Sequence, residues 1–127
     1  MSAGVYTIVC EKGSSFRMDI TYTNNDGTPV HLGGFKARMD VRRSRTTDSR
    51  LITRLETDNG HIQMPSPETG EIILAMPSSE TLDLPEGEFF YDLLIWQDII
   101  QPDMTVNREV VRVVEGNFVI RSGVTQL

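Results

Sequence analysis

The sequence lacks the features that mark a disulfide-bonded, secreted or membrane-spanning protein. It contains one cysteine, Cys10, so no disulfide can form within the chain, and folding in a reducing cytosol is the simplest expectation. No apolar run reaches the ~18 residues that a membrane-spanning helix requires, so we predict no membrane segment. The first residues, Met1–Gly4, lack the basic and then apolar pattern of a secretion signal.

Motifs of catalysis and ligand binding are also missing. The two histidines, His31 and His61, have no Cys, His or acid at a zinc-binding spacing. There is no nucleophile elbow, P-loop or dinucleotide-binding fingerprint. Asp92 and Asp98 flank Trp96, but Asp92 falls in an alternating strand pattern, so we interpret it as a solvated side chain rather than a member of a glycosidase pair. We predict no enzymatic activity, no cofactor and no metal site.

Positive charge is absent from a large part of the chain. Six of the 12 Lys and Arg residues lie between Lys36 and Arg50, and none lies between Leu55 and Asn107, where eleven acids occur. A solvated surface is the simplest interpretation, and the alternative is a subunit with a basic side and an acidic side. Because the formal net charge is −6 and no aromatic residues lie among these arginines, we predict no nucleic-acid binding.

The residues that are present predict strands. Ser14–Thr23 and Phe35–Arg43 alternate between apolar and polar residues, the pattern of a strand with one buried face. Further strands are predicted at Tyr6–Cys10, Leu51–Leu55, His61–Met64, Glu71–Met76 and Val106–Ile120, the last as a strand pair or one bent strand. Turn signals every 8–12 residues then indicate an all-β antiparallel sandwich of about 7–9 strands, a single domain over residues 1–127.

A few local features interrupt this pattern. One short helical turn is predicted near residues 78–82, with Ser78 or Ser79 as its N-cap. Gly116 predicts a bulge or kink within the final strand. The polar segment 43–50 is expected to be a mobile loop, Gln101–Asp103 a turn, and residues 121–127 a C-terminal tail.

The stretch Leu84–Gln97 is predicted to hold the central strand. Pro85 and Gly87 mark a turn, after which apolar residues occur at both parities. We expect one row in the core (Phe89, Tyr91, Leu93 and Ile95) and the other on the opposite face (Phe90, Leu94 and Trp96). An ordinary monomer explains the second row poorly, so we expect loops or another subunit to cover it.

Three segments, in this order, resemble a known family. They are Asn25–Arg42, Gly70–Thr81 continuing through Leu84–Leu93, and Val111–Ile120 ending at Val124-Thr125. The pattern resembles the small immunoglobulin-like β-sandwich domains of tailed-bacteriophage virions, of the upper-baseplate N-terminal and tail- or fibre-attachment type. The resemblance covers about residues 14–125, and it departs from the family at the insertion-like Arg43–Ser49.

The resemblance implies a non-enzymatic structural subunit of a virion, assembled in the host cytoplasm. The tail, the baseplate or a fibre attachment is the expected location, and a head-decoration or head–tail connector protein is the alternative. No catalytic residues carry over. Longer relatives carry further domains where this chain stops, so a stand-alone subunit is expected, with other virion proteins and further copies of itself as partners.

A virion subunit needs surfaces for repeated contacts. Head-to-tail rings need two complementary patches, which a basic strip near Lys36–Arg50 and an acidic half from Glu56 to Asp103 could supply. The candidate interface residues are Arg38, Arg42, Arg43, Arg45, Phe90, Leu94 and Trp96. A function of another class, a carbohydrate-binding module, would use Trp96 and Tyr91 as stacking residues.

Overall fold

The structure is a computed structural model and describes residues 4–125. The strands are β1 (Gly4–Val5), β2 (Ile8–Glu11), β3 (Phe16–Thr21), β4 (Lys36–Arg42), β5 (Leu51–Glu56), β6 (Ile62–Gln63), β7 (Glu71–Met76), β8 (Gly87–Ile100) and β9 (Val106–Arg121). A 3-10 turn, η1 (Pro67–Thr69), precedes β7, and one helical turn, α1 (Ser78–Thr81), follows it.

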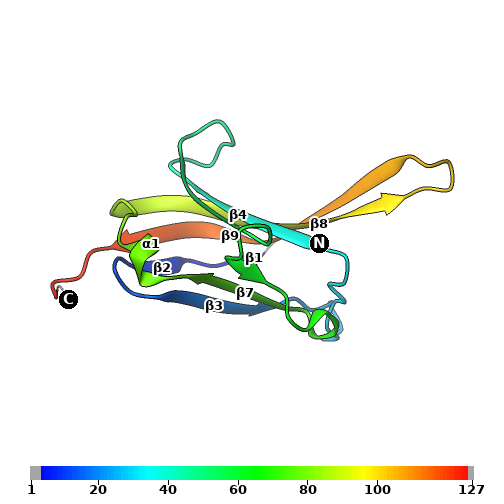
Figure 1. Cartoon of the computed structure of the whole chain (residues 1–127), viewed down its shortest axis with the longest axis horizontal. Coiled ribbons are helices and arrows are strands. Elements are labelled where there is room, and N and C mark those ends of the chain that lie inside the picture. Colours follow the sequence, from blue (N-terminus) through cyan, green and yellow to red (C-terminus); the bar gives the residue numbers. More distant parts are fainter. Residues whose placement is uncertain (1–3, 126–127) are drawn as a thin grey trace.

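The strands form two stacked sheets (Figure 1). The first sheet has six strands in the order β1-β9-β8-β4-β5, with β2 also paired to β9, and the second has three in the order β3-β7-β6. All pairs between these strands are antiparallel except those that β1 and β2 make with β9, which are parallel. This is the order of a variable-type immunoglobulin sandwich, in which β9, β8, β4 and β5 occupy the positions of strands G, F, C and C′.

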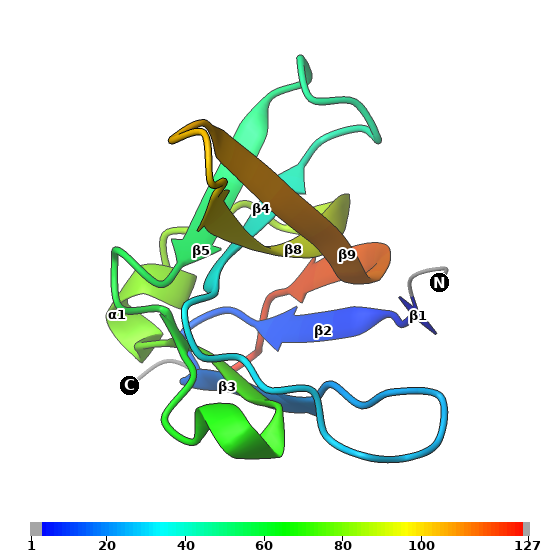
Figure 2. The same cartoon turned by 90° about the vertical axis from the view of Figure 1, so that its right-hand side faces the viewer.

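The sequence prediction of an all-β immunoglobulin-like sandwich is therefore confirmed, with nine strands over the described residues. Its antiparallel character needs one correction. The predicted strand Tyr6–Cys10 begins only at Ile8, as β2, and Tyr6 and Thr7 separate it from β1. Both β1 and β2 pair in parallel with β9. The N-terminal strands β1 and β2 thus lie beside the C-terminal strand β9 at one edge of the first sheet (Figure 2).

The core lies between the sheets, where the predicted alternation places it. The inward row of β8, Phe89, Tyr91, Leu93 and Ile95, is buried, as is the inward row of β4, Ala37, Met39 and Val41. The second sheet contributes Ile72, Leu74 and Met76. The inward residues of β3 stay partly exposed because this strand is the edge of a narrow sheet. Packing of these apolar rows is the main stabilising term.

The helical turn α1 is present, but its predicted serine cap is wrong. The N-cap residue is Pro77, and no side-chain hydrogen bond caps the turn. The side chain of α1 that hydrogen-bonds to the rest of the molecule is Thr81, which is fully buried. Its hydroxyl accepts a hydrogen bond from the Gly13 N–H (3.1 Å) and donates one to the Ser14 carbonyl (2.8 Å), so α1 ties the β2–β3 turn to the sandwich.

The irregularity in β9 lies elsewhere than predicted. β9 is one strand of 16 residues, and Val113 is its extra residue, because Leu93 pairs with Val114 and Leu94 with Arg112. Gly116 instead permits a close approach. Its φ is 155°, and a Cβ there would lie 2.3 Å from the Tyr6 carbonyl oxygen. The N-terminal segment therefore crosses β9 at a position that only glycine fits.

A buried tyrosine hydrogen bond fixes this crossing. The Tyr91 hydroxyl donates to the Tyr6 carbonyl at 2.6 Å, and the Tyr6 N–H donates to the Glu115 carbonyl at 3.0 Å. Desolvation, with smaller contributions from Tyr6 and Glu115, raises the pKa of Tyr91 to about 12. The phenol consequently stays protonated and keeps donating well into the alkaline range.

We predict that Gly116→Ala lowers the free energy of unfolding by about 2–4 kcal/mol, because the new methyl group meets the Tyr6 backbone and the φ disfavours alanine. Gly123→Ala is the control, since nothing lies within 4 Å of its Cβ position, and we expect a change within about 0.5 kcal/mol. Urea unfolding measures both, and equal stability of the two variants would contradict the close-approach account.

A second prediction concerns alkaline pH. Because the folded pKa of Tyr91 is raised, its contribution is complete below the unfolded value near 10 and is lost as pH rises through about 12. Between pH 9 and pH 11 we expect the free energy of unfolding of the parent protein to fall by about 1 kcal/mol more than that of Tyr91→Phe. Urea unfolding at the two pH values tests this against Tyr6→Phe, which retains the accepting carbonyl. Parallel pH dependences of parent and Tyr91→Phe would rule out this linkage.

Candidate interaction face

The candidate residues gather on one side of the molecule. We call the side of the first sheet that faces away from the second sheet the outer face. Because side chains alternate along a strand, the same pairing that buries Met39 and Leu93 turns Arg38 and Leu94 outward. The outer face carries five of the seven predicted interface residues, namely Arg38, Arg42, Phe90, Leu94 and Trp96. Arg43 and Arg45 lie in the adjoining loop 43–50.

Asp40 is the centre of the charge arrangement on this face. Its carboxylate accepts hydrogen bonds from Arg54 (2.6 and 3.0 Å) and from Arg42 (3.0 Å). Burial acts to raise the pKa of Asp40, but the hydrogen bonds and charges of the two arginines outweigh it and hold the pKa below its usual value. Two neighbouring strands are thereby tied together across the outer face.

Several other charges of the outer face are paired in the same way, which favours a surface of mixed sign over the alternative of a basic side and an acidic side. Arg38 contacts Glu56 at 2.8 Å, and Arg112 contacts Asp92 at 3.1 Å and Glu115 at 3.7 Å. The strand register brings bases and acids that are distant in sequence onto one surface. The two signs are interspersed there and neutralise each other locally.

Loop 43–50 holds the basic charge that remains. Within residues 4–125, Arg43, Arg45 and Arg50 make no ion pair, so the loop, which also contains Asp48, has a formal charge of +2. The expected polar loop is confirmed in position, and hydrogen bonds of Ser49 organise it. Its hydroxyl bonds to the carbonyls of Ser44 (3.0 Å) and Thr46 (2.7 Å), and its own carbonyl accepts from Arg42 (2.8 Å).

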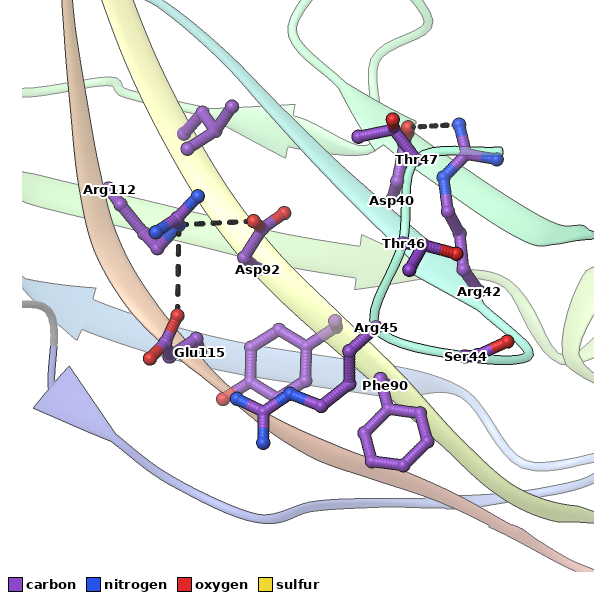
Figure 3. Close-up of a pocket in the computed structure, with 12 residues that line it drawn as sticks. Asp40, Arg42, Ser44, Arg45, Thr46, Thr47, Phe90, Asp92, Arg112 and Glu115 are labelled. Atoms are coloured by element: carbon purple, nitrogen blue, oxygen red, sulfur yellow. Dashed lines mark hydrogen bonds and ion pairs between the residues drawn. The ribbon is translucent and has the colours of Figure 1, made fainter. Parts of the chain in front are cut away.

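A groove of about 340 Å³ lies between this loop and the outer face (Figure 3). Phe90 and Leu94 of β8 supply its apolar lining, and residues 44–47 form one wall. The Arg45 guanidinium lies 5.8 Å from the centroid of the Phe90 ring, a cation–π distance. Arg112 and Glu115 stand on the opposite side (Figure 3). Asp40 and Asp92 lie between Phe90 and Leu94, so the groove has a mixed lining in which two apolar side chains lie among charged ones.

Trp96 is half-buried and is engaged by two arginines. The guanidinium carbons of Arg38 and Arg108 lie 5.4 and 5.9 Å from the centroid of its indole ring. These contacts orient the ring and occupy its surroundings with cations. A sugar-stacking site needs an open aromatic plane, so this arrangement favours an interface anchor over a carbohydrate platform.

A projecting hairpin is the main feature that the sequence prediction missed. We call residues 97–110 the arm. β4 pairs with β8 only as far as Trp96, and among the described strands the arm pairs only with itself (Figure 1). Large apolar side chains are exposed on it, including Ile100 (70% exposed), Met104 (80%) and Val106 (63%). The turn at 101–103 was predicted, but local periodicity does not reveal where the opposing sheet ends.

The described residues offer few groups of the kind that catalysis uses. No group of three or more His, Cys, Asp or Glu within residues 4–125 could hold a metal ion. Cys10 is buried, and this burial, with the charge of Glu11, raises the pKa of its thiol, which disfavours the reactive thiolate. Asp92 and Asp98 each pair with an arginine. Over the same residues, no helix is long and apolar enough to cross a membrane.

No protein-family model and no curated protein matches this chain. Solved structures with some similarity include that of murine CRIg, with 12% identity, a TM-score of 0.42 and coverage of 91% of this chain and 92% of that one. A structure from work on multimeric cell-adhesive interactions of VGSC beta subunits has 12% identity, a TM-score of 0.40 and coverage of 97% and 96%. At these values the similarities assign no partner and no function to this chain.

We predict that Asp40→Asn lowers the free energy of unfolding at pH 7 by about 1–3 kcal/mol, because Arg42 and Arg54 lose their shared anionic acceptor. Since the folded pKa of Asp40 is depressed, its contribution is complete above the unfolded pKa and is lost as pH falls through the folded pKa. The variant should therefore show a shallower loss of stability between pH 5 and pH 2. Thermal unfolding across this range tests it, with the exposed Asp48→Asn as control; no difference between the two variants would contradict the prediction.

Proposed function

We propose that this chain is a non-enzymatic structural subunit of a bacteriophage virion, located in the tail, the baseplate or a fibre attachment. It acts through contacts with other virion proteins and is present in repeated copies. The proposal starts from the three-segment sequence resemblance, and the immunoglobulin-like sandwich is the fold which that resemblance implies. The strand carrying most of it, β8, is the centre of the first sheet.

The arm supports the proposal independently of the sequence resemblance. Its exposed apolar residues are Ile99, Ile100, Met104, Val106 and Val110. Single exposed apolar residues are normal on a monomer, but five on one 14-residue hairpin, with Ile100 and Val106 directly opposite each other, favour an interaction site. A two-stranded ribbon is also marginally stable by itself. Both arguments favour a partner that covers the arm in the assembled state.

The outer face supports the same role. Its ion pairs and cation–π contacts are formed within the chain, so docking requires little further ordering of long side chains. Such a preorganised surface suits a contact that is made many times with the same geometry. A head-decoration or head–tail connector protein would use the same surfaces, and the difference between these roles is location.

We predict that the protein is a constituent of purified phage particles. Mass spectrometry of particles encoded by the phage that carries this chain should detect it at several copies per particle. Immunogold labelling should place it on the tail or baseplate, and labelling of the head would select the head-decoration alternative. Its absence from intact particles would overturn the proposal. Selective binding on a glycan array that Trp96→Ala abolishes would favour the carbohydrate-binding module instead.

A further inference from the structure

We propose that the arm of one copy docks into the groove beside loop 43–50 of another copy, so that the chain assembles with itself. The inference deepens the proposed function and rests on it for the repeated copies. It names two different surfaces of the same chain, one projecting and one recessed. Such a pair of complementary surfaces is what a repeating contact needs.

The arm is built to project an apolar surface. Ile100 and Val106 form a cross-strand pair on the side that continues the outer face, and Met104 stands at the tip. The Asp98–Arg108 ion pair separates this pair from Val110, which lies opposite Trp96. The backbone of Met104 has a positive φ of 70°, which is uncommon for a residue other than glycine, asparagine or aspartate. The Asp103 carboxylate holds this turn by accepting from the Thr105 N–H (3.1 Å) and hydroxyl (2.6 Å). The turn therefore presents a flexible, polarizable thioether on a fixed tip.

The groove offers the matching chemistry. Phe90 and Leu94 provide the apolar part of a lining whose acids, Asp40, Asp92 and Glu115, are matched in number by arginines. The wall formed by residues 44–47 brings Arg45 to the edge of the groove. The loop has a formal charge of +2, whereas the arm, with three acids and one arginine, has a formal charge of −2. Apolar side chains of the arm can thus contact Phe90 and Leu94, and the acids of the arm face the basic loop. Charges of this kind set orientation and association rate.

The groove cannot receive the arm of its own chain. Phe90 and Ile100 belong to the same continuous strand, β8, which is paired along its whole length with β9. At about 3.3 Å per residue, the ten residue steps from one to the other correspond to roughly 33 Å. A paired strand of this kind does not fold back on itself, so the contact has to be made between copies. Reciprocal docking would close a dimer, and one-way docking would build a ring or a filament.

Two variants separate the two surfaces without disturbing the core. The arm variant is Ile100→Glu with Val106→Lys, which replaces an exposed cross-strand apolar pair by an ion pair. The groove variant is Arg43→Glu with Arg45→Glu, which reverses two exposed charges. Leu82→Lys is the control, because Leu82 is similarly exposed (61%) but belongs to neither surface. Circular dichroism and thermal unfolding of the variants should match the parent.

Sedimentation equilibrium at low salt measures the self-association. We expect each double variant to weaken the association constant at least tenfold and the control to leave it unchanged. The decisive step is to mix the two variants, because the arm variant keeps an intact groove and the groove variant keeps an intact arm. The mixture should form a one-to-one complex although neither variant associates alone.

The result that overturns the inference is a parent protein that stays monomeric at high concentration, or variants that fail to complement each other. A parent that is monomeric while its arm variant is missing from particles would assign the arm to a different virion protein. A different result contradicts the proposed function, namely absence of the chain from particles. Self-association of the purified protein could still be measured in that case.

Discussion

The continuous pairing of β8 with β9 is the constraint on which the rest of the structure depends. Every residue of β8, from Gly87 to Ile100, has a partner in β9. The side chains of this ladder that point toward the second sheet belong to the core. Those that point to the outer face include Phe90, Leu94 and Trp96. Its far end leaves the sandwich as the arm. Because one ladder runs through all three regions, the core fixes the direction of the arm and the position of the groove relative to it.

The sequence predicts those properties that depend on which face a side chain occupies. Period-two alternation identified the buried rows of β4 and β8 and the outward row that includes Trp96, because strand geometry dictates both. The alternation does not predict features that depend on which strands pair with each other. Arg38 meets Glu56 through the β4–β5 register, and this pairing dispersed the charge separation that the linear sequence suggested. The arm extends beyond the last residue pair of β8 with its neighbour β4, and alternation within β8 does not encode where that neighbour ends.

The sandwich is closed without the inter-sheet disulfide and tryptophan that antibody domains use. Cys10 is free, and the inward positions of β3 and β8 hold aliphatic or aromatic side chains or methionine. Instead, hydrogen bonds from two side chains hold two N-terminal segments to the rest of the sandwich. Tyr91 holds the Tyr6 carbonyl over Gly116, and Thr81 holds the β2–β3 turn. Both ties use buried hydroxyl groups, whose hydrogen bonds would be costly to leave unmade.

The arm is the part of the molecule that its own fold does not explain. Ordering a residue costs about 1–2 kcal/mol of backbone conformational entropy, and core residues offset this by burial. Ile100, Met104 and Val106 bury little, so within one copy their ordering lacks that compensation. The Asp103 turn and the Asp98–Arg108 pair, at 2.8 Å, are exposed and contribute only modestly. A docked state that covers these exposed apolar side chains supplies the missing burial, and the groove beside the basic loop of a second copy is the matching surface that this chain itself provides.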